Sequence, residues 1–256
     1  MVDAIILAGD TPKDTDLKLL TKVNCKSLIP IAGKPMVEYV VESLAAEKRI
    51  GRVAVVGPVN ELAFLRDHCQ KVELAQHSES ILQNVVAGID LLGNPDKVLV
   101  VTADIPMLTT QAVADFLNQA GATDADFYYS VVRREDNDRK YPGVRRTYVR
   151  LKNGTFTGGN IFMARSRYVS AKMDLVDKMI ALRKEPLKMV KLLGWGFVLK
   201  FLLGVLTINE LESHISGLLG IKGVAVISPY AEVGTDVDKP SDLELARSIL
   251  PYKVHA

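Results

Sequence analysis

Short apolar runs alternate along the chain with segments in which apolar residues recur at helical spacing. The apolar runs predict strands at residues 4–7, 53–56, 98–102, 127–132, 161–164 and 224–227. The helical spacing predicts helices at residues 36–47, 81–92 and 110–120. Strands that alternate with helices of this length are typical of a mainly parallel sheet. Helices on both faces of such a sheet explain why the strand runs are continuously apolar.

Residues 171–220 have a different pattern and read as several apolar helices that carry lysines and arginines. The most apolar part, residues 192–206, is 15 residues long and contains Lys200. A membrane-spanning helix needs roughly 20 apolar residues, so this stretch is too short to span a bilayer. We therefore expect residues 171–220 to be a buried helical insert. The less favoured alternative is that residues 187–206 contact a membrane or a lipid-like substrate, because bases beside an apolar face suit an interface.

Composition narrows the class of protein. A chain of 256 residues with 48% hydrophobic and 24% charged residues is expected to form one soluble domain, residues 1–256. The net charge of +2 argues against a nucleic-acid partner. Cys25 and Cys69 lack zinc or redox spacing, and no apolar signal core follows Met1, so we expect reduced thiols in a cytoplasmic protein. Nothing in the sequence indicates an oligomeric state.

Polar turns follow two of the predicted strands, and ligands of open α/β sheets bind beyond the carboxyl ends of strands. One turn contains Ala8, Gly9 and Asp10, the other Asp104, and both should open on the same side. A glycine after a strand lets backbone N–H groups approach phosphate oxygens, and Lys26 could neutralise the phosphate charge. An ordinary turn and a solvated lysine are the alternative. No P-loop or GxGxxG pattern is present, which argues against ATP hydrolysis and hydride transfer.

Carboxylates near the ends of the apolar runs suggest a metal site. Asp104 directly follows a strand, where a buried charge must be paired or bind a cation. The alternative, that Asp104 caps the next helix, is weakened because Thr109 and Thr110 are better placed to do so. One residue separates Asp236 from Asp238. Their carboxylates would supply oxygen ligands for Mg²⁺ if they converge with Asp104. They could also be a loop pair that faces solvent.

An acceptor site is suggested by a glycine turn and a group of bases. Asn160 follows the tight turn at residues 157–159 and offers both a donor and an acceptor to substrate hydroxyls. Seven arginines and lysines lie between residues 133 and 150. They could bind a phosphorylated acceptor through charge-assisted hydrogen bonds. A solvated strand face is the alternative, and nucleic acid is disfavoured by the balanced total charge.

The order of these motifs resembles the MobA-like nucleotidyltransferase family. The resemblance rests on residues 7–9, 26–36, 103–109, 157–160 and 236–243 and covers roughly residues 3–168 and 222–248, with the predicted insert outside it. It implies a Rossmann-like three-layer α/β/α fold of the GT-A, or nucleotide-diphospho-sugar transferase, type. It also implies a Mg²⁺-dependent enzyme that transfers an NMP from an NTP to a phosphorylated sugar, polyol, cofactor or lipid precursor and releases pyrophosphate.

The resemblance also assigns site residues. Residues 78–88 occupy the place where relatives bind the base. Lys26 and Asp104 would be catalytic, and the Mg²⁺ ligands would be Asp104 with Asp236 or Asp238. The nucleotide would contact Leu7, Ala8, Gly9, Asp10, Lys26, Ser80, Asn84 and Thr102. The acceptor would contact Arg145, Arg146, Gly159 and Asn160.

The chain departs from the family pattern at Asp10, which replaces a second glycine, and Lys13 is the only base nearby. A carboxylate repels polyphosphate unless a metal ion lies between them. A catalytically impaired nucleotide-binding protein is therefore one alternative. A GT-A glycosyltransferase is another, although the strand before Asp104 ends without the usual DxD pair. Residues 11–24 are predicted to form a flap over the nucleotide.

Overall fold

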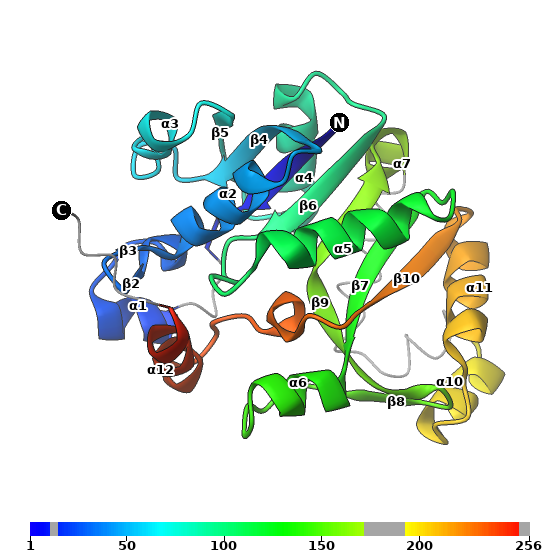
Figure 1. The fold of residues 1–256 in the computed structure, drawn as a ribbon. Helices are drawn as coiled ribbons and strands as arrows, with labels where there is room; N and C mark the ends of the chain where they lie inside the picture. Colours follow the sequence, from blue (N-terminus) through cyan, green and yellow to red (C-terminus); the bar gives the residue numbers. More distant parts are fainter. Residues whose placement is uncertain (11–14, 172–192, 251–256) are drawn as a thin grey trace.

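The computed structural model describes residues 1–10, 15–171 and 193–250 (Figure 1). Its main sheet has the strand order β10-β7-β9-β6-β1-β4-β5, and β8 pairs with β9 at the side. β9 is antiparallel to β6 and β7, whereas the other neighbours on the main path are parallel. The strands are β1 (Val2–Leu7), β4 (Ile50–Gly57), β5 (Val72–Gln76), β6 (Lys97–Thr102), β7 (Phe127–Arg133), β8 (Val149–Leu151), β9 (Gly154–Arg165) and β10 (Gly223–Ser228). A small hairpin joins β2 (Pro30–Ile31) to β3 (Lys34–Pro35).

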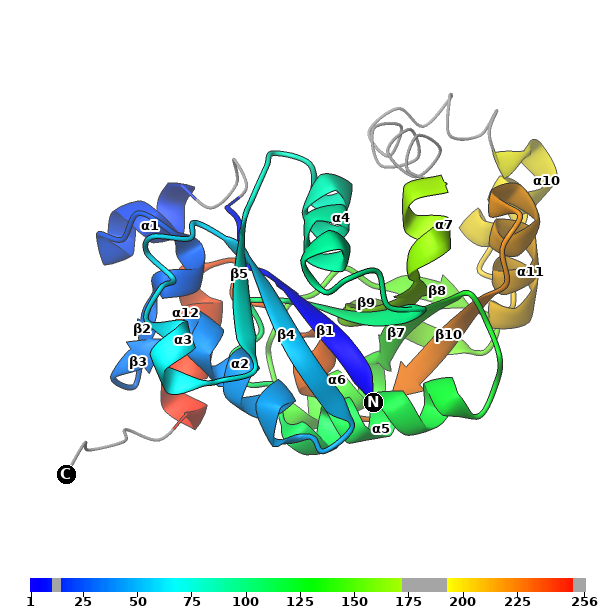
Figure 2. The same ribbon diagram turned by 90° about the horizontal axis from the view of Figure 1, so that it is seen from above.

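Helices cover both faces of this sheet, as the view in Figure 2 shows. On one face lie α2 (Met36–Ala46) and α5 (Thr110–Gly121), and on the other lie α4 (Ile81–Leu91) and α7 (Ser166–Ala171). Alternate residues of β1 enter different core layers, Ala4 and Ile6 on one side and Ile5 on the other. The remaining helices of the described residues are α1 (Thr15–Thr21), α3 (Leu65–His68), α6 (Arg134–Lys140), α10 (Trp195–Leu202), α11 (Ile208–Leu219) and α12 (Pro240–Ile249), with 3₁₀ turns at Lys26–Leu28 and Ala231–Gly234.

The predicted mainly parallel α/β sheet and its strands and helices are confirmed, with ends that shift by a few residues. β5 was not predicted, because its residues alternate in burial at the sheet edge and form no continuous apolar run. Only the second half of β9 was predicted, since the polar residues at 157–160 read as a turn and instead continue the strand. Thr109 is the N-cap of α5, as expected, which leaves Asp104 available for another role.

The prediction of a buried helical insert is wrong for α10, which has no buried residue. Its neighbour α11 packs beside β10 and begins with a capping box between Thr207 and Glu210. Figure 1 shows both helices at one end of the sheet, beyond β10 and β8, and among the described residues α10 is attached to α11 through Phe197 and Lys200. None of the helices in the described ranges has the length and apolar content to cross a membrane. Residues 172–192 of the predicted insert lie outside the described residues.

Substitution of two glycines that lie inside helices tests how closely α4 packs on the sheet. A Cβ at Gly88 would lie 2.7 Å from the Ile5 side chain, whereas a Cβ at Gly217 of α11 would meet nothing within 4 Å. We expect Gly88→Ala to lower the free energy of unfolding by about 1–3 kcal/mol through overpacking. Gly217→Ala should raise it by about 0.5–1 kcal/mol through helix propensity alone. Urea unfolding monitored by circular dichroism measures both, and an equal gain in the two variants would contradict this packing.

Candidate active site

One cleft of about 740 Å³ opens at the carboxyl ends of β1 and β6. The two polar turns that follow these strands line the same cleft, as the sequence predicts. Of the residues assigned to a site from the sequence, those that line it are Leu7, Ala8, Gly9, Asp10, Lys26, Asn84, Thr102, Asp104, Gly159, Asn160, Asp236 and Asp238. Segments that are far apart in the sequence therefore meet in one place.

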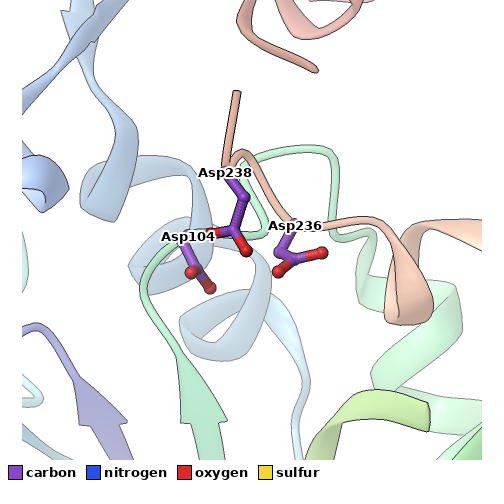
Figure 3. Close-up of side chains that lie close together, drawn as sticks. All are labelled: Asp104, Asp236 and Asp238. Atoms are coloured by element: carbon purple, nitrogen blue, oxygen red, sulfur yellow. The ribbon is translucent and has the colours of Figure 1, made fainter. Parts of the chain in front are cut away.

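Three carboxylates converge in this cleft, as Figure 3 shows. One ligand oxygen from each of Asp104, Asp236 and Asp238 lies within 4.8 Å of the others. Thr102 Oγ donates a hydrogen bond of 2.5 Å to Asp104 Oδ1 and fixes that carboxylate. A set of carboxylate oxygens suits a hard divalent cation such as Mg²⁺, which takes one or two carboxylates together with substrate phosphates and water. The cluster could hold a metal ion.

Lys26 lies against these acids and is buried, with 7% of its surface exposed. Its Nζ donates to Asp104 Oδ2 at 2.8 Å and to Asp238 Oδ1 at 2.6 Å. Burial alone would lower the pKa of Lys26, but the two carboxylates outweigh it, and the pKa lies above its ordinary value. For Asp238, burial is outweighed by the hydrogen bond from Lys26, and its pKa is lowered. The ammonium group is therefore charged at every physiological pH.

Asp236 is held by Arg146, whose Nη1 lies 2.5 Å from the Asp236 carboxylate and whose Nη2 donates to the Asp236 carbonyl at 2.6 Å. Burial and the neighbouring Asp104 raise the pKa of Asp236 to about 6, although Arg146 acts in the opposite direction. The Val237 N–H donates to the Asp104 carbonyl at 2.8 Å, which ties the two acidic loops together.

The loop that carries Asp236 and Asp238 is also anchored from the helix that follows. The backbone N–H groups of Asp238 and Lys239 both donate to Asp242 Oδ2 at 3.1 Å. Asp242 is the third residue of α12, and Pro240 begins that helix. Proline suits the first position of a helix, so residues 240–242 both begin α12 and anchor the loop before it.

The carboxylate of Asp10 accepts hydrogen bonds from two groups of the chain. Its Oδ1 accepts the backbone N–H of Lys26 at 2.8 Å, and its Oδ2 accepts Lys18 Nζ at 2.8 Å. Asp10 thus orients the turn that carries Lys26, and the α1 residue Lys18 offsets its charge. Within the predicted flap, residues 15–21 form α1, whereas residues 11–14, including Lys13, lie outside the described part of the chain.

The loop after β5 forms another wall of the cleft. A Cβ at Gly9 would lie 3.0 Å from the His77 ring, so a larger residue there would require the ring to shift. Asn84 Oδ1 accepts the Ser78 N–H at 2.6 Å, and Asn84 Nδ2 donates to the Ser78 carbonyl at 3.1 Å. Ser80 is the N-cap of α4 and does not line the cleft. Ser80 and Asn84 therefore shape this loop, and their predicted contact with the nucleotide stays a prediction.

The opposite wall comes from β7 and β9. A Cβ at Gly159 would lie 2.1 Å from Ser130 Oγ, so close packing of the two strands requires glycine there. Asn160 Nδ2 donates to the Val233 carbonyl at 3.2 Å while the residue lines the cleft. Arg145 is exposed, and neither it nor Arg146 lines the cleft. Their predicted role toward the acceptor stays a prediction, and the contact that the structure shows for Arg146 is with Asp236.

Sequence reasoning missed two aromatic residues of the cleft, Tyr129 and Phe162. They face each other in register across β7 and β9. Burial, together with the Asp236 charge, raises the pKa of Tyr129. Both lie inside apolar runs that were assigned to the core, so only the pairing of the two strands could reveal them. Of the other lining residues, Ser78, Glu79 and Ile81 lie in the segment 78–88 that the resemblance assigned to the base, and Ser27 and Ala103 adjoin the assigned residues Lys26 and Asp104.

Comparison with known families gives one match over most of the chain, the MobA-like NTP transferase domain, at residues 4–189. The chain belongs to the MobA-like NTP transferase family. The match extends into the predicted insert at 171–220, beyond the range of the motif resemblance. No match is found among curated proteins.

Solved structures also resemble this NTP transferase domain. A hypothetical transferase from Thermus thermophilus is 35% identical, with a TM-score of 0.81, and the alignment covers 94% of this chain and 99% of that one. The 4-diphosphocytidyl-2C-methyl-D-erythritol synthase of Anaerococcus prevotii is 10% identical, with a TM-score of 0.60 and coverage of 97% and 95%. CMP:2-keto-3-deoxy-manno-octonic acid synthetase complexed with CTP is 14% identical, with a TM-score of 0.61 and coverage of 97% and 98%. The two distant matches show the shared nucleotidyltransferase fold.

The thiol of Cys25 reports on the turn that Asp10 holds. Cys25 is 3% exposed, and burial raises its pKa, so iodoacetamide should modify it far more slowly than Cys69 in the native protein. Asp10→Ala removes the acceptor of the Lys26 N–H and should speed modification of Cys25 at least about tenfold, because a lost hydrogen bond to a charged group is worth about 1.5–3 kcal/mol. Peptide mass spectrometry measures the rate at each cysteine.

A matched control is Asp3→Ala at the other end of β1, where Asp3 Oδ1 accepts the Arg52 N–H at 2.8 Å. This variant loses a similar hydrogen bond far from Cys25 and should leave its modification rate unchanged. If Cys25 reacts equally fast in wild type and in Asp10→Ala, Asp10 does not hold the turn.

Proposed function

We propose that this protein is a Mg²⁺-dependent nucleotidyltransferase that transfers an NMP from an NTP to a phosphorylated small molecule and releases pyrophosphate. The observation that carries the proposal is the group of Asp104, Asp236 and Asp238 with Lys26 among them, at a glycine turn in a large cleft. Membership of the NTP transferase family supports the same reaction. The cytoplasmic location expected from the sequence is part of this proposal.

The reaction needs positioning and charge neutralisation more than covalent help. An oxygen of the acceptor phosphate attacks the α-phosphorus of the NTP, the bond to the bridging oxygen breaks, and pyrophosphate leaves. Asp104, with Asp236 or Asp238, would hold Mg²⁺, which when bound would neutralise charge on the phosphates. Lys26 exchanges its contact with Asp238 for one with the phosphates and stabilises the charge on the leaving pyrophosphate.

The other cleft residues position the two substrates. Gly9 and Asp10 line the cleft, and their backbone N–H groups would donate to phosphate oxygens, whereas the Ala8 N–H already donates to the Val56 carbonyl at 2.8 Å. The loop fixed by Asn84 lies beside them. We assign the base to that loop. The acceptor would lie on the β7 and β9 wall, against Asn160 and the aromatic rings of Tyr129 and Phe162. CTP is the first nucleotide to test, because the names of two structural neighbours contain a cytidine nucleotide.

The alternative of a nucleotide-binding protein without catalysis rested on Asp10. Its carboxylate is paired with Lys18 and with the Lys26 N–H, so it offers little free charge to repel a polyphosphate. A thermal-shift measurement still separates the two functions, since an NTP that binds the native state raises its stability whether or not turnover follows. Stabilisation by NTP and Mg²⁺ without pyrophosphate release from any acceptor phosphate would favour the binding protein. A glycosyltransferase is not proposed, since the family is that of NTP transferases.

The direct test is pyrophosphate release from CTP, GTP, ATP and UTP in the presence of Mg²⁺ and a panel of sugar, polyol and lipid-precursor phosphates. We expect Asp104→Asn to lower kcat by at least about 100-fold, which is typical when a charge-stabilising group of an active site is removed. The nucleotide should still be bound, because the loop that we assign to the base is intact. Full activity of Asp104→Asn would contradict the proposed site.

The control variant is Asp96→Asn, at the other end of β6. Asp96 pairs with Arg165 at 2.7 Å, and its side chain is largely exposed. The same change of charge there should leave kcat within about twofold of wild type, because surface ion pairs contribute little. Equal losses in the two variants would point to a general effect of the substitution instead of a local role of Asp104.

A further inference from the structure

Exposed apolar side chains are concentrated in one short segment. Of the twelve large apolar side chains that are exposed in the described parts of the chain, six lie within residues 195–205. These six, which we call the α10 patch, are Trp195 (75% exposed), Leu199 (57%), Phe201 (37%), Leu202 (74%), Leu203 (65%) and Val205 (48%). Scattered exposed leucines are ordinary on soluble proteins, but a continuous group marks an interaction surface.

The patch has the geometry of one helix face. Trp195, Leu199 and Leu202 are spaced i, i+4 and i+7, so they form a single stripe along α10. The other side of α10 is attached to α11: the Phe197 ring stacks on His214 with centroids 4.0 Å apart, and Lys200 Nζ donates to Glu210 at 2.8 Å. The domain therefore holds α10 by one side and presents the apolar stripe outward.

The turn after α10 is also packed against the domain. Leu206 is buried in an apolar cluster with Leu151, Phe156 and Ile208, and its carbonyl accepts the Lys152 N–H at 2.9 Å. Gly204 lies against the Arg150 side chain, with a Cβ position only 3.3 Å from Arg150 Cδ. The exposed residues thus sit on a supported platform and are not an unpacked end of the chain.

Bases surround this platform. Arg150 and Lys152 are exposed beside the turn, and Lys200 lies on α10 itself with 55% of its side chain exposed. Glu210, the acid beside the helix, is paired with Lys200. Residues 193–207, all of which the structure describes, contain Lys200 and no acidic residue. An apolar stripe with a basic rim complements a surface that is apolar inside and negatively charged at its edge.

We propose that the α10 patch binds the surface of an anionic lipid bilayer. A helix of eight residues is about 12 Å long and cannot cross a hydrocarbon core of about 30 Å, so α10 would lie in the plane of the headgroups. Tryptophan and leucine would enter the boundary between headgroups and acyl chains, and the bases would contact lipid phosphates. A second copy fits less well, because a two-fold contact through this face would bring the same bases of both copies together.

The single tryptophan of the chain makes the test direct, because it is Trp195. The full chain is mixed with vesicles of phosphatidylcholine alone or of phosphatidylcholine with phosphatidylglycerol. We expect a blue shift of tryptophan emission and co-sedimentation with the anionic vesicles, both weakened by salt. The neutral vesicles should bind at least about tenfold less protein, since each base near an anionic surface adds about 1 kcal/mol.

Variants locate the contact. Leu199→Ser with Leu202→Ser keeps the tryptophan as reporter and should weaken vesicle binding at least about tenfold, because it removes two apolar side chains from the stripe. The matched control is Leu19→Ser with Leu20→Ser, two similarly exposed leucines on α1. This control should bind vesicles as wild type does. Circular dichroism checks that both variants are folded, as expected for exposed positions.

Several results would overturn the proposal. Emission that is unchanged by anionic vesicles would do so, as would equal binding to neutral and anionic vesicles. Loss of binding in the α1 control as well as in the α10 variant would show that the contact is not local to the patch. The patch would instead be assigned to self-association by two results together. Light scattering would give the mass of two chains, and tryptophan emission would change on dilution but not on addition of lipid.

Discussion

The ion cluster around Lys26 joins three parts of the chain that are far apart in sequence. Lys26 lies in the 3₁₀ turn at Lys26–Leu28, Asp104 follows β6, and Asp238 lies in the loop before α12. One ammonium group nevertheless contacts both acids. Breaking a buried charge pair leaves an uncompensated charge in a poorly solvated place, which is costly. The position of each loop at the mouth of the cleft therefore depends on the others. A backbone hydrogen bond from Val237 to Asp104 reinforces the arrangement without using any charge.

The cluster nevertheless contains more negatively charged than positively charged groups. Lys26 and Arg146 face the three carboxylates of Asp104, Asp236 and Asp238, and Arg146 Nη2 also lies 3.8 Å from the buried Asp242. Repulsion from Asp104, added to burial, is the reason that the pKa of Asp236 rises to about 6. A divalent cation would relieve this repulsion. The same excess of negative charge would oppose a bare polyphosphate, so metal and nucleotide are expected to bind together.

Much of this arrangement could be predicted from the sequence, because local patterns placed the strand ends. The apolar runs before Gly9 and Asp104 showed where the sheet would end, and parallel strands bring such ends to the same edge. The role of Asp10 could not be predicted, since it depends on α1 returning Lys18 to the turn. Arg146 was assigned to the acceptor because the sequence shows its charge. The sequence does not show that its guanidinium pairs with the carboxylate of Asp236. Tyr129 and Phe162 became visible only through the register of β7 with β9.

The proposed reaction requires a cation and a nucleotide to bind together at Lys26 and the three acids. A crystal structure of the protein with Mn²⁺ in place of Mg²⁺ and a non-hydrolysable CTP analogue tests this most directly, because the anomalous signal of manganese locates the ion. We predict a single strong peak at about 2.0–2.2 Å from an oxygen of Asp104 and from one of Asp236 or Asp238, with Lys26 Nζ on a phosphate oxygen. Manganese bound elsewhere, or a nucleotide outside this cleft with Lys26 still joined to both acids, would contradict the account.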